Sequence, residues 1–148
     1  MPEFRPGRPE SNFASRFWEQ LGIPSQGSDL IELVRAGFAI TVLKRLSAVS
    51  AFSEAELTQM MGLSRYALRQ GRRSGRLSML HSDRLYRTAR VIAAAVELYD
   101  GNQTAARRWL FAPQLGLGGR SPVTMCATEI EGKAVLDLLG RLETGVVI

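Results

Sequence analysis

Helix start and stop signals recur along almost the whole chain, and they constrain its fold more than any other feature. Ser53 and Glu56 form the reciprocal Ser-x-x-Glu pattern that opens a helix, and Gly62 ends that helix. Similar signals predict helices over residues 13–21, 28–49, 54–61, 65–73, 83–99, 103–112 and 130–143, with a short helix at Ser121-Pro122. Clean alternation of polar and apolar residues is absent. The sequence therefore predicts an all-α protein of about seven or eight helices.

Three predicted helices carry an apolar face. In the segment 28–49, apolar residues recur at every fourth position, and Gly37 bends or splits the helix: Leu30, Val34, Phe38, Val42 and Leu46. In 83–99, where Ser82 is the expected cap, one narrow arc is apolar and arginines fan across the other side: Leu85, Ala89, Ile92, Val96 and Tyr99 against Arg84, Arg87 and Arg90. In 130–143 one face holds Ile130, Ala134, Val135, Leu138, Leu139 and Leu142. These faces predict the core.

Composition sets the broad class and the division of the chain. Residues 1–12 contain three prolines and one glycine, so we expect residues 1–27 to be a partly disordered extension. A helix-turn-helix domain is expected over 28–100, and composition changes again at Gly101, where a second domain, 101–148, begins. No apolar run approaches the roughly 20 residues of a membrane span, and the N-terminus lacks a secretory signal. We expect a cytoplasmic protein.

Charge points to an anionic partner. The chain has 17 Arg and 2 Lys against 14 acids, and its sequence pI is about 10.1. Nucleic acid is the first candidate for such a partner. One Cys and one His exclude a disulfide framework and the usual zinc sites. His81, Ser82 and Asp83 are only neighbours in sequence, so they predict no catalytic triad. We expect no enzymatic activity, no metal and no cofactor.

The strongest local signal is the pair of short helices around Gly62. Leu57, Met61, Leu63 and Leu68 have the spacing that locks two helices together through a tight turn. Between Arg65 and Arg90 there are eight arginines and a single acid. The second helix would read bases through Arg65, Tyr66, Arg69 and Gln70, and would contact phosphates through Arg72, Arg73 and Arg76. The alternative is an ordinary helical hairpin with a solvated basic face.

The C-terminal half offers weaker signals. The glycine-rich run 116–121 has no preceding strand, so a tight loop is favoured over a phosphate site. Trp109 is either an interface anchor or, more commonly for such a residue, part of the core, and Cys126 is expected to fill a core gap. The chain ends in an apolar tail, Val146-Val147-Ile148, that either packs on its own domain or enters a pocket elsewhere.

Several motifs, specific in their order and spacing, resemble the Xre/MbcA/ParS antitoxin family over about residues 30 to 148. They are Gly37-Phe38, Arg76-Leu77, Ser82-Asp83-Arg84-Leu85-x-Arg87, Ala106-x-x-Trp109-Leu110-x-x-Pro113, Leu117-Gly-Gly-x-Ser121-Pro122, Thr128-x-x-x-Gly132 and Val135-x-x-Leu138-Leu139-Gly140-Arg141-Leu142-Glu143-x-Gly145-Val146. The departures from the family pattern are His81 for Glu, Thr144 for His and Thr58 for Ala.

The resemblance implies an antitoxin that pairs with a RES-domain toxin, an enzyme that degrades NAD or uses it to ADP-ribosylate a target. It also implies an Xre-like helix-turn-helix over about 54–73, a homodimer, and a complex that binds its own promoter DNA as an autorepressor. Toxin contacts would lie at the C-terminal end: Trp109, Gly118, Gly119, Arg141, Glu143, Gly145, Val146, Val147 and Ile148. The alternative function is a stand-alone helix-turn-helix regulator with a C-terminal oligomerisation domain.

Overall fold

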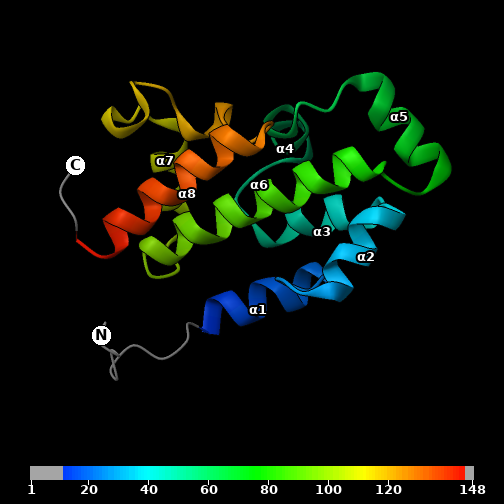
Figure 1. The fold of residues 1–148 in the computed structure, drawn as a ribbon, viewed down its shortest axis with the longest axis horizontal. Coiled ribbons are helices and arrows are strands. Elements are labelled where there is room, and N and C mark those ends of the chain that lie inside the picture. The colour runs from blue at the N-terminus through cyan, green and yellow to red at the C-terminus, as the bar shows by residue number, and fades with distance from the viewer. Residues whose placement is uncertain (1–11, 146–148) are drawn as a thin grey trace.

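The protein is described by a computed structural model of residues 12–145, which is helical throughout (Figure 1). Eight α-helices and two short 3-10 helices make up this part of the chain: α1 Asn12–Leu21, α2 Ser28–Ala36, α3 Thr41–Val49, α4 Glu54–Met61, α5 Arg65–Ser74, α6 Met79–Leu98, α7 Gln103–Phe111, η1 Leu115–Leu117, η2 Pro122–Thr124 and α8 Glu129–Glu143. The described residues contain no strand, which confirms the all-α prediction. None of the described helices could cross a membrane.

Helix α6 is the centre of the fold. It contacts α1, α2 and α4, and it also contacts α7 and α8. The arc predicted along this helix is confirmed for Leu85, Ala89, Ile92 and Val96, which are fully buried, whereas Tyr99 follows the last residue of α6 and is partly buried. One hydrophobic cluster runs from Phe17 in α1 to Leu139 in α8. The two halves expected from composition therefore share a continuous core, with α6 passing through both.

The predicted helix over 28–49 is divided at Gly37, as one of the two expected outcomes. Gly37 has φ 90°, and a Cβ there would collide with the carbonyl oxygen of Leu77. Residues 37–40 instead pair with the chain after α5: Leu77 N–H donates to Phe38 O at 2.9 Å, and Ile40 N–H donates to Gly75 O at 2.9 Å. The break therefore ties α2 and α3 to the segment that joins α5 to α6.

The predicted start of the central helix was wrong. The helix begins at Met79, and the Oγ of Ser78 accepts the N–H of His81 as its cap. Ser82, expected to be the cap, is buried, and its Oγ accepts the N–H of Phe38 at 2.7 Å. Two serines one turn apart give the same local signal, and only packing against Phe38 distinguishes them.

The predicted apolar face of the last helix was wrong at its ends. Val135, Leu138 and Leu139 are buried as expected, but Ile130 is 83% exposed and Leu142 is also exposed. The buried face includes Gly132 instead, which lies against the side chain of Arg87. Ile130 points away because a helix turns by about 200° from one residue to the second residue after it, here from Ile130 to Gly132.

Candidate functional site

The α4–α5 pair is built from reciprocal local contacts. Ser53 Oγ accepts the N–H of Glu56 at 3.1 Å, and Glu56 Oε1 accepts the N–H of Ser53 at 3.0 Å, so the predicted capping box is confirmed. Gly62 then turns the chain with φ 69°, and Ser64 caps α5. The four residues expected to lock the pair are buried or partly buried: Leu57, Met61, Leu63 and Leu68. A tight, apolar-locked turn thus connects the two helices.

Thr58 occupies a buried position in α4 without an unsatisfied hydroxyl. Its Oγ1 donates to the carbonyl oxygen of Ala55 at 2.9 Å. The hydroxyl is therefore bonded within its own helix, and the pair accommodates threonine where the family pattern has alanine.

Helix α5 presents most of the predicted DNA-contacting residues to solvent. Six of the seven are exposed, and Gln70 is half-buried: Arg65, Tyr66, Arg69, Arg72, Arg73 and Arg76 are the exposed residues. The helix packs through Gly71, where an added Cβ would lie 3.2 Å from Ile40 and 3.3 Å from Leu77. This close approach by glycine holds α5 against the fold and leaves a basic face outward.

The cations of this face are not equivalent. Arg76 Nη1 donates to Gly37 O at 2.7 Å, so its guanidinium is bound to the linker between α2 and α3. Arg72 Nη2 pairs with Glu54 Oε1 at 3.2 Å across the turn. Arg65, Arg69 and Arg73 have no ion-pair partner among residues 12–145. These three are the cations most available to an anionic ligand.

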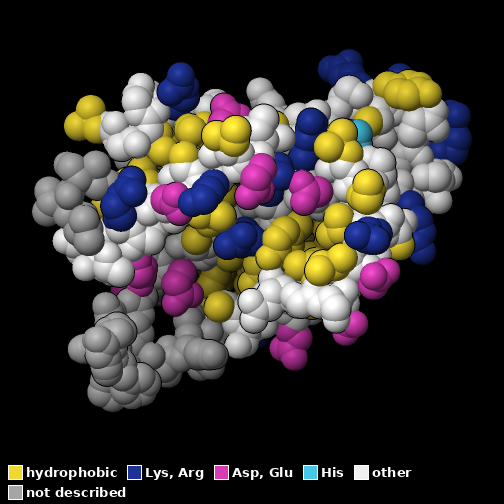
Figure 2. Space-filling view, viewed as in Figure 1, with side chains coloured by type: hydrophobic (Ala, Val, Ile, Leu, Met, Phe, Trp, Pro, Cys, Tyr) yellow, Lys and Arg dark blue, Asp and Glu magenta, His cyan; other side chains and the backbone are white. Residues whose placement is uncertain are grey.

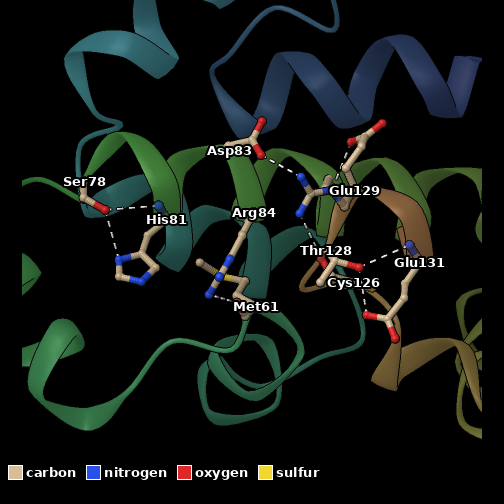
Figure 3. A network of polar contacts seen from close by, with 10 residues as sticks. Met61, Ser78, His81, Asp83, Arg84, Cys126, Thr128, Glu129 and Glu131 are labelled. Atoms are coloured by element: carbon tan, nitrogen blue, oxygen red, sulfur yellow. Dashed lines mark hydrogen bonds and ion pairs between the residues drawn. The ribbon is translucent and has the colours of Figure 1, made fainter. Parts of the chain in front are cut away.

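Arg87 of α6 does not face solvent as predicted, because it is only 8% exposed. Its Nη2 pairs with Asp83 Oδ2 at 2.6 Å, its Nε lies 3.4 Å from Glu129 Oε1, and its Nη1 donates to Cys126 O at 3.2 Å. Figure 3 shows Asp83, Glu129 and Cys126 gathered at this point, with Arg84 directed toward Met61 at the α4–α5 turn. One stretch of α6 thus contacts both α8 and the α4–α5 pair.

A second ion pair joins α4 to α7, and sequence reasoning missed it. Arg107 bonds both carboxylate oxygens of Glu56, at 2.8 Å and 2.6 Å, and lies over the rings of Phe111 and Phe52. The hydrogen bond from Arg107 is the largest cause that lowers the pKa of Glu56 to about 2, although burial opposes the shift. Glu56 therefore caps α4 and also holds the C-terminal half in place.

The other candidate surface lies where η1 packs against α8. Gln114 closes the loop, because its N–H donates to Arg120 O at 3.1 Å and its side-chain amide donates to Trp109 O at 2.9 Å. Gly118 and Gly119 are exposed in this loop and have positive φ. Leu115 lies beside them and is 97% exposed. The sequence does not single this residue out, because the glycine-rich run around it predicts only a loop.

The structure places the remaining predicted toxin contacts near the C-terminal end, with one exception. Arg141 and Gly145 are exposed and Glu143 is half-buried in the last turns of α8, at the same end of the molecule as the η1 loop (Figure 1). Trp109 is only 9% exposed and belongs to the core. Val146, Val147 and Ile148 lie outside the described residues.

Cys126 and the neighbours His81, Ser82 and Asp83 do not form a reactive site among residues 12–145. Cys126 is fully buried, as predicted for a core filler, and burial raises the pKa of its thiol to about 12. His81 Nδ1 lies 3.1 Å from Ser78 Oγ, whereas Ser82 and Asp83 are bonded to Phe38 and Arg87. Burial is the first cause that lowers the pKa of His81.

Comparison with known proteins gives concordant matches. Residues 94–145 match the family model described as the Xre/MbcA/ParS antitoxin C-terminal toxin-binding domain. A protein of Yersinia enterocolitica described as antitoxin Xre is 36% identical over 131 residues, which cover 87% of this chain and 88% of that protein. A second antitoxin Xre, from Photorhabdus laumondii, is 30% identical over 132 residues, 88% of this chain and 89% of that protein.

Proposed function

Because this chain belongs to the Xre antitoxin family, we propose that it neutralises a RES-domain toxin by blocking the toxin's NAD-binding active site. A toxin as partner follows from the family. The toxin class is what the resemblance of the C-terminal half implies, and the mode of inhibition is inferred from the apolar residues at positions 146–148. The observation that carries the proposal is the end of the molecule at which the η1 loop packs on α8, which lies within the residues that match the toxin-binding model.

That end combines a hydrogen-bonded loop, an exposed apolar side chain and a glycine after α8. The hydrogen bonds of Gln114 already order the backbone of the loop that presents Leu115, which is 97% exposed, so little backbone entropy is lost when a partner covers it. Arg141 and Glu143, in the last turn of α8, would supply polar contacts to the same partner. Gly145, with φ 79°, lets the last residues turn away from the axis of α8.

The tail is proposed to act as a plug. A toxin that binds NAD must hold a pyrophosphate, so its cleft should present cationic and backbone donors. The apolar side chains of Val146, Val147 and Ile148 would cover the wall beside that anion subsite and block access to it. Burial of each would contribute roughly 1.5–3 kcal/mol before entropic losses. NAD would then be excluded by occupancy, without distortion of the toxin.

The chain is further proposed to bind its own promoter as a homodimer. The exposed basic face of α5 supports this role, because Arg65, Arg69 and Arg73 have no ion-pair partner among residues 12–145. A single helix-turn-helix gives limited affinity, so a dimer on a pseudo-palindrome is expected.

The decisive experiment uses a purified RES-domain toxin, taken from the neighbouring gene if that gene encodes one. Purified toxin is mixed with the full chain or with a chain ending at Gly145, and binding and NAD consumption are measured on the same samples. We expect the full chain to suppress NAD consumption, and the shortened chain to bind the toxin through the η1 loop with most NAD consumption restored.

Two outcomes count against the proposal in different ways. If the shortened chain folds, binds and still suppresses NAD consumption completely, the plug is wrong and inhibition comes from the docking surface. If the full chain does not bind the RES-domain protein at all, the assigned toxin class is wrong.

A further inference from the structure

Three of the large hydrophobic side chains that the structure leaves exposed gather on α2 and the first turn of α6. Ile31 is 54% exposed, Met79 58% and Leu80 54%. Figure 2 shows hydrophobic side chains clustered over α2 and the first half of α6. Apolar surface of this kind on a small soluble protein marks an interaction site more often than chance placement does.

These side chains border a groove of about 540 Å³ between the two helices. Leu30 and Val34 of α2 line it on one side, and Met79, Leu80 and Tyr86 of α6 line it on the other. The exposed apolar side chains and the groove therefore form one continuous surface. We call it the α2–α6 face, and its residues are Leu30, Ile31, Val34, Arg35, Met79, Leu80, Asp83 and Tyr86.

The charges on this face are of opposite sign. Arg35, in the last turn of α2, has no ion-pair partner among residues 12–145. Asp83, in the second turn of α6, uses Oδ2 to hold Arg87, and its side chain is 51% exposed. An isologous two-fold contact brings each surface against itself, so Arg35 of one copy can meet Asp83 of the other. The α2–α6 face thus carries two opposite charges that can pair across a two-fold contact.

Other occupants fit this face less well. None of its residues lies within 94–145, the segment that matches the toxin-binding model, and the η1 loop lies at the opposite end of α6 (Figure 1). DNA would not favour an apolar groove that carries an aspartate. Residues 1–11 join α1 at the far end of α6 and contain three prolines and four charged residues, so they have few apolar side chains to fill it.

We infer that the α2–α6 face is the surface through which two copies of this chain associate. This inference rests on the proposed function only where it gives the dimer a role, which is to bind promoter DNA. Leu80 follows the end of α5 by six residues, so an interface here joins the ends of the two molecules that carry the basic helices. That is the arrangement in which two recognition helices address two half-sites of one operator.

The test compares two exposed leucines in the purified full chain by sedimentation at micromolar concentration. Wild type should have twice the 16.3 kDa mass of one chain. Leu80→Glu should have the mass of one chain, because two carboxylates would be forced into the apolar contact. Leu115→Glu, at the other end of the molecule, should remain a dimer. Circular dichroism checks that each variant stays helical.

Arg35→Glu gives an independent measurement that removes no apolar contact. It should weaken dimerisation about tenfold, and added salt should narrow its difference from wild type, because an attractive pair becomes a repulsive one. If Leu80→Glu loses helicity, this variant decides the question. No change in the dimer constant for Arg35→Glu would overturn the proposed pairing.

Three further results would overturn the inference. The first is a wild type that is monomeric. This includes a wild type that dimerises only after residues 1–11 are deleted, because those residues would then be the occupant of the face. The second is a helical Leu80→Glu that remains a dimer. The third is a loss of toxin binding by Leu80→Glu without a change in the mass of the free chain. Failure of wild type to bind the RES-domain toxin would leave the dimer result intact, so the two proposals fail separately.

Discussion

Gly132 of α8 lies so close to Arg87 of α6 that an added Cβ would be 2.5 Å from Cδ of the arginine. Arg87 needs that space, because its guanidinium is buried and bonded to Asp83, Glu129 and Cys126 at once. The missing side chain at Gly132 therefore permits the contact between the central helix and the last one.

Gly132→Ala should destabilise the protein by about 1–3 kcal/mol, since the new methyl group overpacks a site that Arg87 fills. Urea unfolding followed by circular dichroism measures the change. Gly140→Ala is the matched control in the same helix, because nothing lies within 4 Å of a Cβ there. That variant should gain about 0.5–1 kcal/mol from helix propensity. Equal effects of both substitutions would contradict the role given to Gly132.

The pair formed by Glu56 and Arg107 should make stability depend on acid pH. The pKa of Glu56 is lowered from 4.5 to about 2 in the fold, so its contribution is fully present above its ordinary pKa and is lost as pH falls toward 2. Because both side chains are about one-third exposed, we expect only about 1–2 kcal/mol. Unfolding of wild type and of Arg107→Met at pH values from 7 down to 2 measures it.

Arg108→Met is the control for that series, because Arg108 is an exposed arginine in the same helix and the ion pair is formed by Glu56 and Arg107. The difference between wild type and Arg107→Met should shrink below pH 4, whereas Arg108→Met should follow wild type throughout. A difference that is the same at every pH would mean that Arg107 acts through packing on Phe52 and Phe111 alone.

On operator DNA, Arg69→Ala should lose about 1–3 kcal/mol of specific binding if Arg69 reads a base edge with two hydrogen bonds. Arg73→Ala should instead reduce the salt dependence of binding by about one phosphate contact and keep the sequence preference. Fluorescence anisotropy on the upstream region, at several salt concentrations, separates the two effects. Arg16→Ala, which changes an exposed arginine on α1, is the control. Equal binding to unrelated DNA at every salt concentration would rule out specific recognition.

For toxin binding, Leu115→Asp should weaken the complex about tenfold or more and leave stability unchanged, because the side chain is almost fully exposed in the free protein. Ile130→Asp changes an equally apolar, exposed residue at the other end of α8 and should have little effect. Titration calorimetry with the RES-domain toxin compares them. A larger loss for Ile130→Asp would move the docking surface to the start of α8.

The sequence was sufficient wherever the physical signal is local. A cap acts on residues within one turn, so the capping box of Ser53 and Glu56 and the stop at Gly62 could be read directly, as could the arc through Leu85 and Ile92. These signals predicted the all-helical fold and the order of its helices. The family motifs then indicated an antitoxin, which the relatives confirm.

The tertiary structure decided everything that depends on partners distant in sequence. Ser78 and Ser82 carry the same local signal, and only the approach of Phe38 removes Ser82 from the surface. Arg87 is polar and was expected outside, but Asp83, Glu129 and Cys126 O offset the cost of burying its charge. Glu56 and Arg107 are 51 residues apart, and no spacing rule joins them. The exposure of Leu115 likewise follows from how its loop is closed, because burial depends on which surfaces meet and a sequence pattern records only which residues are apolar.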